Sequence, residues 1–243
     1  MRTIEVCSCS VDAVLEAAAG GAARVELCAD LGCGGITPSA GMVRRARAAC
    51  GRNGVQLHVL IRPREGDFVY DRDELQTMVE DVRFCAEAGV DGVVFGALDE
   101  RGGIDVDACR SLAHAAGSMS KTFHRAFDVC AAPSAALEQI ISLGFERILT
   151  SGAQSDALSG AGLIAELVRQ AAGRIIIMPG AGINPSNIAF LQRLTGACEF
   201  HSSARAPYAR HRTERGSEAF GTSSELRTSR DIVRALVEES IDF

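Results

Sequence analysis

The strongest constraint on the fold of this chain is a repeated alternation of short apolar runs with longer amphipathic stretches. Eight apolar runs recur, at residues 3–7, 24–28, 55–61, 92–96, 121–125, 147–151, 175–179 and 198–202. Each is followed by a polar or Gly-rich loop and a stretch with helical periodicity, and several of these end at a glycine, as a left-handed helix C-cap requires. Strict strand–helix alternation predicts a parallel sheet. Eight such units in 243 residues predict one α/β domain, a (β/α)8 TIM barrel over residues 1–243.

The composition narrows the classes of partner and compartment. The net charge of −6 and the pI near 5.4 argue against a general attraction to nucleic acid. No apolar run approaches the roughly 18 residues of a membrane-spanning helix, and the chain start lacks a secretory pattern. The nine cysteines are scattered from Cys7 to Cys198, so we expect reduced thiols in a cytoplasmic protein. From the charge and the lack of a long apolar run, we expect neither nucleic-acid nor membrane partners.

Polar side chains gather at the carboxyl ends of the predicted strands. In a TIM barrel these ends and the loops that follow them form the one functional face. We expect the following residues to meet there: Glu5, Cys7, Glu26, Cys28, Arg62, Arg64, His124, Arg125, Asp128, Ser151, Gly152, Gly180, Gly182, Glu199, His201 and Ser203. The opposite face should carry basic residues that only aid solubility: Arg24, Lys121, Arg147 and Arg174.

Two interpretations of this polar set remain open. One is a structural network, in which the buried carboxylates of Glu5 and Glu26 pair with Arg62, Arg64 or Arg125. The other is a functional site, because two histidines and three arginines at one mouth exceed what a structural network needs.

The functional interpretation gives each side chain a role. Arginine matches the paired oxygens of a carboxylate or phosphate, and a Gly-rich turn before a helix can bind an anion through free N–H groups. The residues assigned to anion binding are Arg62, Arg64, Arg125, Ser151, Gly152, Gly180 and Gly182. The general acid or base would be His124 or His201, oriented by one of three carboxylates, those of Glu5, Glu26 and Asp128.

Side-chain parity places both histidines inside the barrel. Successive residues of a strand face opposite sides, and Phe123 suits the side that faces the helices, so His124 faces inward and Arg125 lies on the outer side. Glu199 and His201 share a side by the same rule. We therefore expect both imidazoles in one cavity, each beside a carboxylate that fixes its tautomer and raises its basicity.

Two cysteines form a second candidate site. Cys7 and Cys28 end neighbouring strands, and two thiolates make a soft site for Cu(I). Two thiolates that share one metal at about 2.3 Å each should have their sulfurs within about 4 Å of each other. Cys9 and Cys33, in the following loops, could add ligands. Plain packing of buried cysteines is the alternative, since no CxxC pair with zinc-ribbon spacing is present.

The motifs of this chain resemble those of the CutC family along nearly its whole length. The segments that carry the resemblance are "IEVC", "GAARVELCADLGCGGITPS", "IRPREGDFVY", "DGVVFGAL", "TFHRAFD", "GFERILTSGA", "IMPGAGI" and "EFHSSAR". The resemblance implies a cytosolic (β/α)8 barrel that forms a homo-oligomer and acts in copper homeostasis, with Cu(I) held by the cysteines at positions 7 and 28. Residues 206–223 depart from the family pattern.

Two functions therefore stand side by side. The first is a copper homeostasis protein that binds Cu(I) at Cys7 and Cys28 without turnover. The second is a TIM-barrel enzyme that acts on a small anionic or phosphorylated metabolite at the C-terminal mouth of the barrel.

Overall fold

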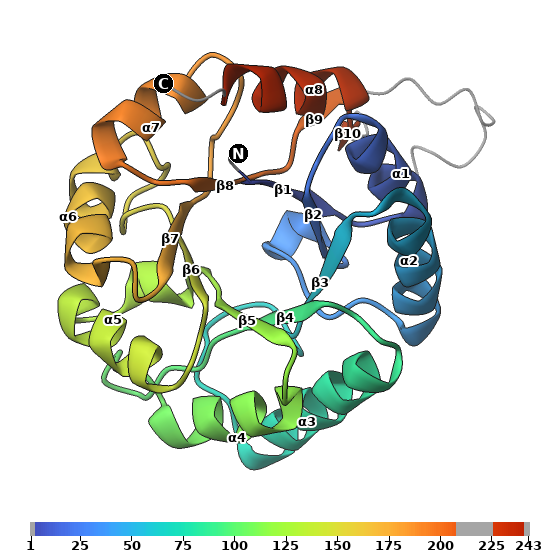
Figure 1. Cartoon of the computed structure of the whole chain (residues 1–243). Coiled ribbons are helices and arrows are strands. Elements are labelled where there is room, and N and C mark those ends of the chain that lie inside the picture. Colours follow the sequence, from blue (N-terminus) through green and yellow to red (C-terminus); the bar gives the residue numbers. More distant parts are fainter. Residues whose placement is uncertain (1–2, 208–225, 241–243) are drawn as a thin grey trace, which may run out of the picture.

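The computed structural model describes residues 3–207 and 226–240 and contains an eight-stranded parallel barrel (Figure 1). Around the barrel the strands follow the order β7-β6-β5-β4-β3-β2-β1-β8. Their bounds are β1 Thr3–Ser8, β2 Arg24–Leu27, β3 Gln56–Leu60, β4 Gly92–Phe95, β5 Ser120–Phe123, β6 Arg147–Thr150, β7 Ile176–Pro179 and β8 Glu199–Ser202. The predicted TIM barrel is confirmed.

Helices surround the barrel and begin where polar side chains cap them. Ser10, Ser39 and Asp71 accept hydrogen bonds from backbone N–H groups in the first turns of the first three helices, and Glu74 completes a capping box with Asp71. The helices are α1 Val11–Ala19, α2 Ala40–Asn53, α3 Arg72–Glu87, α4 Val106–Ala116, α5 Pro133–Ser142, α6 Ala161–Ala171, α7 Ile188–Thr195 and α8 Arg230–Glu239. The shorter elements are the 3-10 helices η1 Leu31–Cys33 and η2 Arg125–Val129 and the antiparallel strands β9 Arg205–Pro207 and β10 Leu226–Thr228.

The main apolar core lies between the barrel and its helices. Val6, Val25, Phe95, Phe123 and Phe200 alternate with inward-facing residues along their strands and are fully buried in this core. Burial of each such side chain stabilises the fold by about 1.5–3 kcal/mol. The residues between them face the barrel interior, and many of these are polar or charged.

A buried charge network crosses the barrel interior. Arg24 of β2 donates hydrogen bonds to Glu5 of β1 and, at 2.5 Å, to Glu199 of β8. Arg147 of β6 donates to the same Glu199 carboxylate at 2.8 Å. Because β2, β6 and β8 are not neighbours in the sheet, these bonds run through the interior.

The prediction that four basic residues at strand starts only aid solubility is therefore wrong for three of them. Arg24 is 1% exposed and, like Arg147, belongs to the network inside the barrel. Lys121 is buried on the face of β5 that it shares with Phe123, outside the barrel interior, and its Nζ donates to the Met119 carbonyl. Only Arg174 pairs at the surface, with Glu138.

A close approach between β3 and β4 requires a glycine. Gly92 is the register partner of His58, and a Cβ at position 92 would lie 2.6 Å from Nε2 of the fully buried His58 ring. The imidazole thus lies directly against the Gly92 backbone. Burial lowers the pKa of His58 to about 3, so the ring is neutral at physiological pH.

The segment predicted as a strand over 121–125 is shorter than expected. β5 ends at Phe123, and His124 is the N-cap of η2, where its Nδ1 accepts a hydrogen bond from the N–H of Ala126 at 3.3 Å. The imidazole thereby satisfies a turn N–H, and the chain leaves the sheet at this point. His124 and Arg125 consequently lie just beyond the strand.

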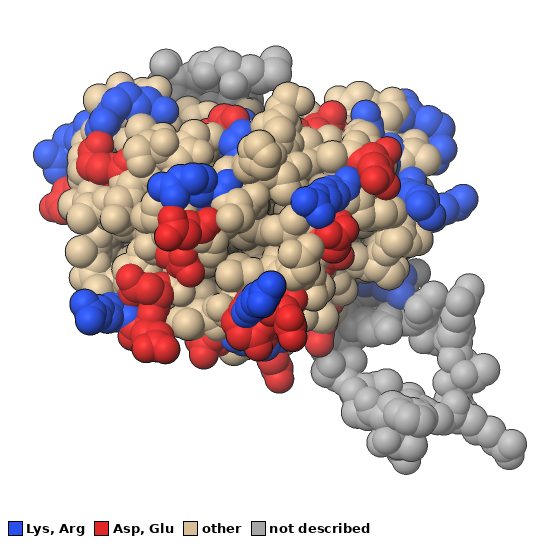
Figure 2. All heavy atoms as spheres, turned by 90° about the horizontal axis from the view of Figure 1, so that it is seen from below, with Lys and Arg blue, Asp and Glu red and all other residues tan. Residues whose placement is uncertain are grey.

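The described surface mixes both signs of charge. Figure 2 shows basic and acidic side chains interspersed on the face that carries α3 and α4, in keeping with i,i+3 ion pairs such as Arg83–Glu80 and Arg110–Asp107. Within the described ranges, no helix is both long enough and apolar enough to cross a bilayer.

Candidate functional site

A cavity of about 500 Å³ opens at the carboxyl ends of the strands. Its walls include ten of the residues predicted at the mouth: Cys7, Glu26, Cys28, Arg62, His124, Arg125, Asp128, Gly182, His201 and Ser203. Glu5 lies deeper in the barrel, under His201. Five other predicted residues do not line the cavity: Arg64, Ser151, Gly152, Gly180 and Glu199, which starts β8.

The two strand-end thiols meet inside this cavity. The Sγ atoms of Cys7 and Cys28 are 3.5 Å apart, which satisfies the limit of about 4 Å for sharing one metal. Both cysteines are free and buried, and they pack with Leu60 and Val94. The hydrogen bond with Cys28 and burial hold the pKa of Cys7 well above its usual value, and Glu26 raises it further, so this thiol is protonated at neutral pH.

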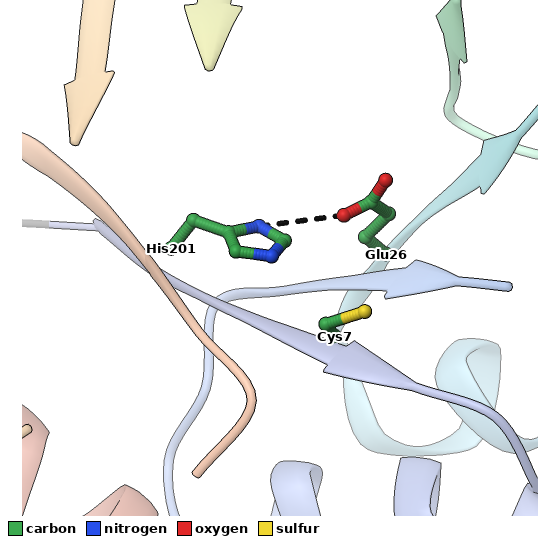
Figure 3. Close-up of side chains that lie close together, drawn as sticks. All are labelled: Cys7, Glu26 and His201. Carbon is green, nitrogen blue, oxygen red and sulfur yellow. Dashed lines mark ion pairs between the residues drawn. The ribbon is translucent and has the colours of Figure 1, made fainter. Parts of the chain in front are cut away.

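His201 lies beside the thiols, held by two carboxylates from below. Its Nδ1 is 2.7 Å from Glu5 Oε1 and 3.4 Å from Glu26 Oε2. Cys7, Glu26 and His201 each offer a ligand atom within 4.8 Å of the others, and Figure 3 shows the three side chains converging. With Nδ1 committed to the carboxylates, Nε2 is the ring nitrogen left for a ligand.

The electrostatics of this cluster follow from burial and from the charge network beneath it. Burial would raise the pKa of Glu5, but Arg24 and the hydrogen bond from His201 hold it well below its usual range. Burial raises the pKa of Glu26 to about 7, and the neighbouring Glu5 carboxylate adds to this shift. Burial disfavours the His201 cation, yet Glu26 and Glu5 raise the pKa of His201 above its ordinary value. The cluster therefore combines an imidazole whose pKa is raised by two carboxylates with a carboxyl group that titrates near neutral pH.

The predicted ion pairs of the carboxylates are wrong in detail. Glu5 pairs with Arg24 and His201, and Glu26 lies beside His201. Arginines of the mouth do not supply these contacts in the described part of the chain.

His124 enters the cavity as predicted, but without a carboxylate. It is 5% exposed, and it packs on Phe68 with ring centroids 4.9 Å apart. Burial, with the nearby Arg62 cation, lowers the pKa of His124 to about 3. The expectation of a carboxylate beside each imidazole therefore holds for His201 and fails for His124.

The two arginines of the "IRPREGDFVY" segment bind the protein's own loops. Arg62 is buried and donates to the carbonyl oxygens of Cys33, Gly35 and Gly66 at 2.8–3.0 Å. Arg64 pairs with Glu74 and Asp67. Arg62 faces the cavity, whereas Arg64 fixes the start of α3.

Asp128 belongs to η2, and its side chain reaches the loop that follows β6. Its carboxylate accepts hydrogen bonds from the Ser151 N–H at 2.9 Å and the Ala153 N–H at 3.3 Å, and it pairs with Arg125 at 2.8 Å. The N–H of Gly152 donates to Thr150 Oγ1 instead. The donors predicted to hold an external anion here are thus satisfied by a carboxylate of the chain itself.

In the Gly-rich turn after β7, the N–H of Gly180 donates to the Thr150 carbonyl at 2.9 Å. The N–H groups of Asn184 and Ser186 donate to the side-chain oxygens of Asn187 and Asn184, respectively. α7 begins only at Ile188, three residues after the predicted start near Pro185. The N–H groups of Asn184 and Ser186, just before α7, are therefore not free to bind an external anion.

Three functional contributors escaped prediction. Arg24 and Arg147 looked like strand-start surface residues, and His58 looked like an ordinary strand residue. Parity could have found Arg24, because it shares a side of its strand with Glu26 and Cys28. The sequence carries no comparable signal for the contact of His58 with Gly92. Residues 206–223, which depart from the family pattern, lie outside the described residues apart from positions 206 and 207.

Fold and site together define a class: a TIM barrel whose mouth carries a buried thiol pair beside a carboxylate-held imidazole. Donors of this kind suit a soft transition metal ion. The family model of the CutC family matches residues 2–206, and the chain belongs to that family.

Relatives support the assignment over most of the chain. A CutC family protein from Parabacteroides distasonis is 49% identical over 97% of this chain and 99% of its own length. One from Xanthomonas axonopodis pv. citri is 55% identical over 85% of each chain. The crystal structure of CutC from Streptococcus agalactiae, whose name refers to copper homeostasis, is 33% identical with a TM-score of 0.81, covering 84% of this chain and 99% of that one.

More distant structures share the fold alone. Thiamine phosphate pyrophosphorylase from Pyrococcus furiosus matches with a TM-score of 0.63 at 14% identity, covering 98% of this chain and 95% of that one. This likeness confirms the TIM barrel and carries no information on activity.

Proposed function

We propose that this protein acts in copper homeostasis by binding Cu(I) between the thiolates of Cys7 and Cys28. The observation that carries the proposal is the 3.5 Å separation of the two buried sulfurs at the barrel mouth. Thiolates are the soft ligands that Cu(I) prefers. The naming of the Streptococcus agalactiae relative for copper homeostasis adds support.

His201 is the third ligand in this proposal. Its Nδ1 bonds the Glu5 carboxylate, and Glu5 in turn bonds Arg24. A carboxylate on the far nitrogen is the usual arrangement behind a metal-bound imidazole, because it fixes the tautomer and aims the other nitrogen. Nε2 would therefore complete a trigonal site with the two sulfurs.

Glu26 has a different role, since Cu(I) has little preference for a carboxylate oxygen. Its carboxyl group lies beside both Cys7 and His201. Metal binding has to displace the thiol protons, and a group that titrates near neutral pH at this position can take one up.

Competition for Cu(I) tests the proposal. The affinity of the anaerobic, reduced protein is measured against a chromophoric Cu(I) chelator, for the parent and for the Cys7→Ser/Cys28→Ser variant. We expect the double variant to lose the site, and His201→Asn to weaken it, because Asn keeps a donor to Glu5 but lacks Nε2. Cys198→Ser, at an exposed position, is the matched control and should leave the affinity unchanged. Parent-like affinity in the double variant would refute the proposal.

The alternative, an enzyme acting on a phosphorylated metabolite, has less support. Three of the loop N–H groups predicted to hold the phosphate are bonded within the protein: that of Ser151 to Asp128, and those of Gly152 and Gly180 to the hydroxyl and the carbonyl of Thr150.

Two further properties belong to this proposal. A cytoplasmic location suits nine free cysteines, because a reducing compartment keeps thiols available for Cu(I).

Self-association into a homo-oligomer follows the family resemblance, and Phe190 and Leu194, one turn apart on α7, are about half exposed. Sedimentation of the purified protein, with and without a Phe190→Ser change, tests the oligomer.

A further inference from the structure

The cavity at the barrel mouth is too large for a metal ion alone. At about 500 Å³ it lies in the range of small-molecule sites, roughly 300–1,000 Å³. Much of its wall is apolar, formed by Leu31, Leu60, Phe68, Val129, Leu149 and Ile183. Such a wall fits the body of an organic molecule.

One donor on this wall lacks a partner. His124 Nδ1 accepts the Ala126 N–H, so the proton of the neutral ring is on Nε2. Nε2 is buried and bonds no group within residues 3–207 and 226–240. An unpaired buried N–H is costly, which makes it a place where a ligand acceptor gains affinity.

A buried cation without a counter-ion lies next to this donor. Arg62 is 6% exposed, and among the described residues its guanidinium donates to the neutral carbonyl oxygens of Cys33, Gly35 and Gly66. No described carboxylate lies within 4.0 Å of it. Phe68 packs against both groups, with the Arg62 Cζ 5.0 Å from its ring centre and the His124 ring at 4.9 Å.

We propose that this cavity binds a small organic monocarboxylate with an apolar body, whose carboxylate accepts the His124 Nε2–H and offsets the charge of Arg62. One uncompensated cation matches one negative charge. A phosphate would need more donors, and the nearby loop donors are bonded within the protein. The site does not depend on copper.

Titration of metal-free, reduced protein tests this directly. Butyrate and benzoate are the probes, butyramide and benzamide their neutral controls, and inorganic phosphate the competing anion. Affinity is measured by calorimetry, and the Nε2–H resonance of His124 is followed in protein labelled with ¹⁵N-histidine. We expect both carboxylates to bind and to shift this resonance, and the amides and phosphate to do neither.

Two variants isolate the donor. His124→Gln and His124→Phe both lose the acceptor for Ala126, but Gln keeps an N–H near the position of Nε2. We expect Gln to retain binding and Phe to weaken it by about tenfold or more, the usual effect of a hydrogen bond to a charged acceptor. The Cys7→Ser/Cys28→Ser variant should retain carboxylate binding, which separates this site from the copper site.

Several results would overturn the inference: no binding by either carboxylate, binding of the amides with equal affinity, preference for phosphate, or loss of carboxylate binding in the double serine variant. If both His124 variants fail to fold, the resonance of the parent decides, because a ligand bound elsewhere leaves the Nε2–H signal unchanged.

Discussion

Replacing Arg24 by methionine tests whether the charge network inside the barrel holds the fold together. Arg24 of β2 is 1% exposed and links the Glu5 carboxylate of β1 to the Glu199 carboxylate of β8, on the far side of β1. Breaking a buried ion pair by removing one partner costs about 3–5 kcal/mol, because the other charge stays buried. Glu5 keeps His201 and Glu199 keeps Arg147. We therefore expect the lower end of that range, about 3 kcal/mol.

The surface pair of Arg174 provides the control. Arg174 also makes two bonds to one carboxylate, Glu138, at 2.7 and 2.9 Å, but both side chains are 46% exposed. Solvent screens an exposed pair of this kind, so it contributes little to stability. Urea unfolding of the parent, Arg24→Met and Arg174→Met gives the two differences under identical conditions.

The effect of Arg24→Met should depend on pH. In the parent the pKa of Glu5 is depressed, so its pairing stabilises the fold above the unfolded carboxyl pKa of about 4.3, and this stabilisation is lost as the pH falls. In the variant Glu5 is buried without Arg24 and takes up a proton more readily. The deficit should shrink in acid, and Glu5→Gln added to Arg24→Met should recover part of it. Equal costs for Arg24→Met and Arg174→Met would refute the reasoning.

Three other predictions follow from the interior. Gly92→Ala should destabilise the protein by about 1–3 kcal/mol, since the new Cβ overlaps the His58 ring, and adding His58→Ala should reduce that cost in a double-mutant cycle; additive costs would contradict the contact. Because the pKa of His58 is about 3 in the fold and about 6.5 unfolded, the unfolded state alone binds this proton between those values. The parent should thus lose about 1.4 kcal/mol per pH unit relative to His58→Asn as the pH falls from 6.5, measured by urea unfolding at several pH values, and a constant difference would exclude a buried neutral ring. Cu(I) affinity should rise at least about tenfold per pH unit from pH 6 to 8, because the metal displaces the proton of Cys7, and a flat profile in the chelator competition would show that no thiol is a ligand.

The barrel was predictable because its signal is local and repeated. Each strand and helix has its own periodicity, and the strand ends of a parallel barrel meet at one face whatever the details. Cys7 and Cys28 could be paired from strand order alone.

The partners of the polar residues were less predictable, because they depend on side chains from strands far apart in the sequence. Glu199 bonds Arg24 and Arg147, which lie 175 and 52 residues away. Asp128 satisfies the β6 loop because η2 turns it back over the mouth, and the strand rule does not reach beyond Phe123. The N–H groups of Ser151, Gly152 and Gly180, which the motifs predicted as anion donors, were therefore already bonded within the protein.

The seam of the barrel bears on how a metal would enter and leave. β7 and β8 are neighbours in Figure 1, yet they are the two ends of the strand order, and the described residues form no backbone ladder between them. Cys7 and Cys28 belong to β1 and to the end of β2, strands that are laddered on both edges, whereas His201 is on β8, which is laddered only to β1. In the proposed metal site, Cys7 and Cys28 are therefore held by strands paired on both edges, whereas His201 is held by a strand paired on one edge. A movement of the β8 edge that faces β7 would shift His201 relative to the two sulfurs while the β1–β2 pairing stays intact, so in the proposed site the third ligand can move without separating Cys7 from Cys28.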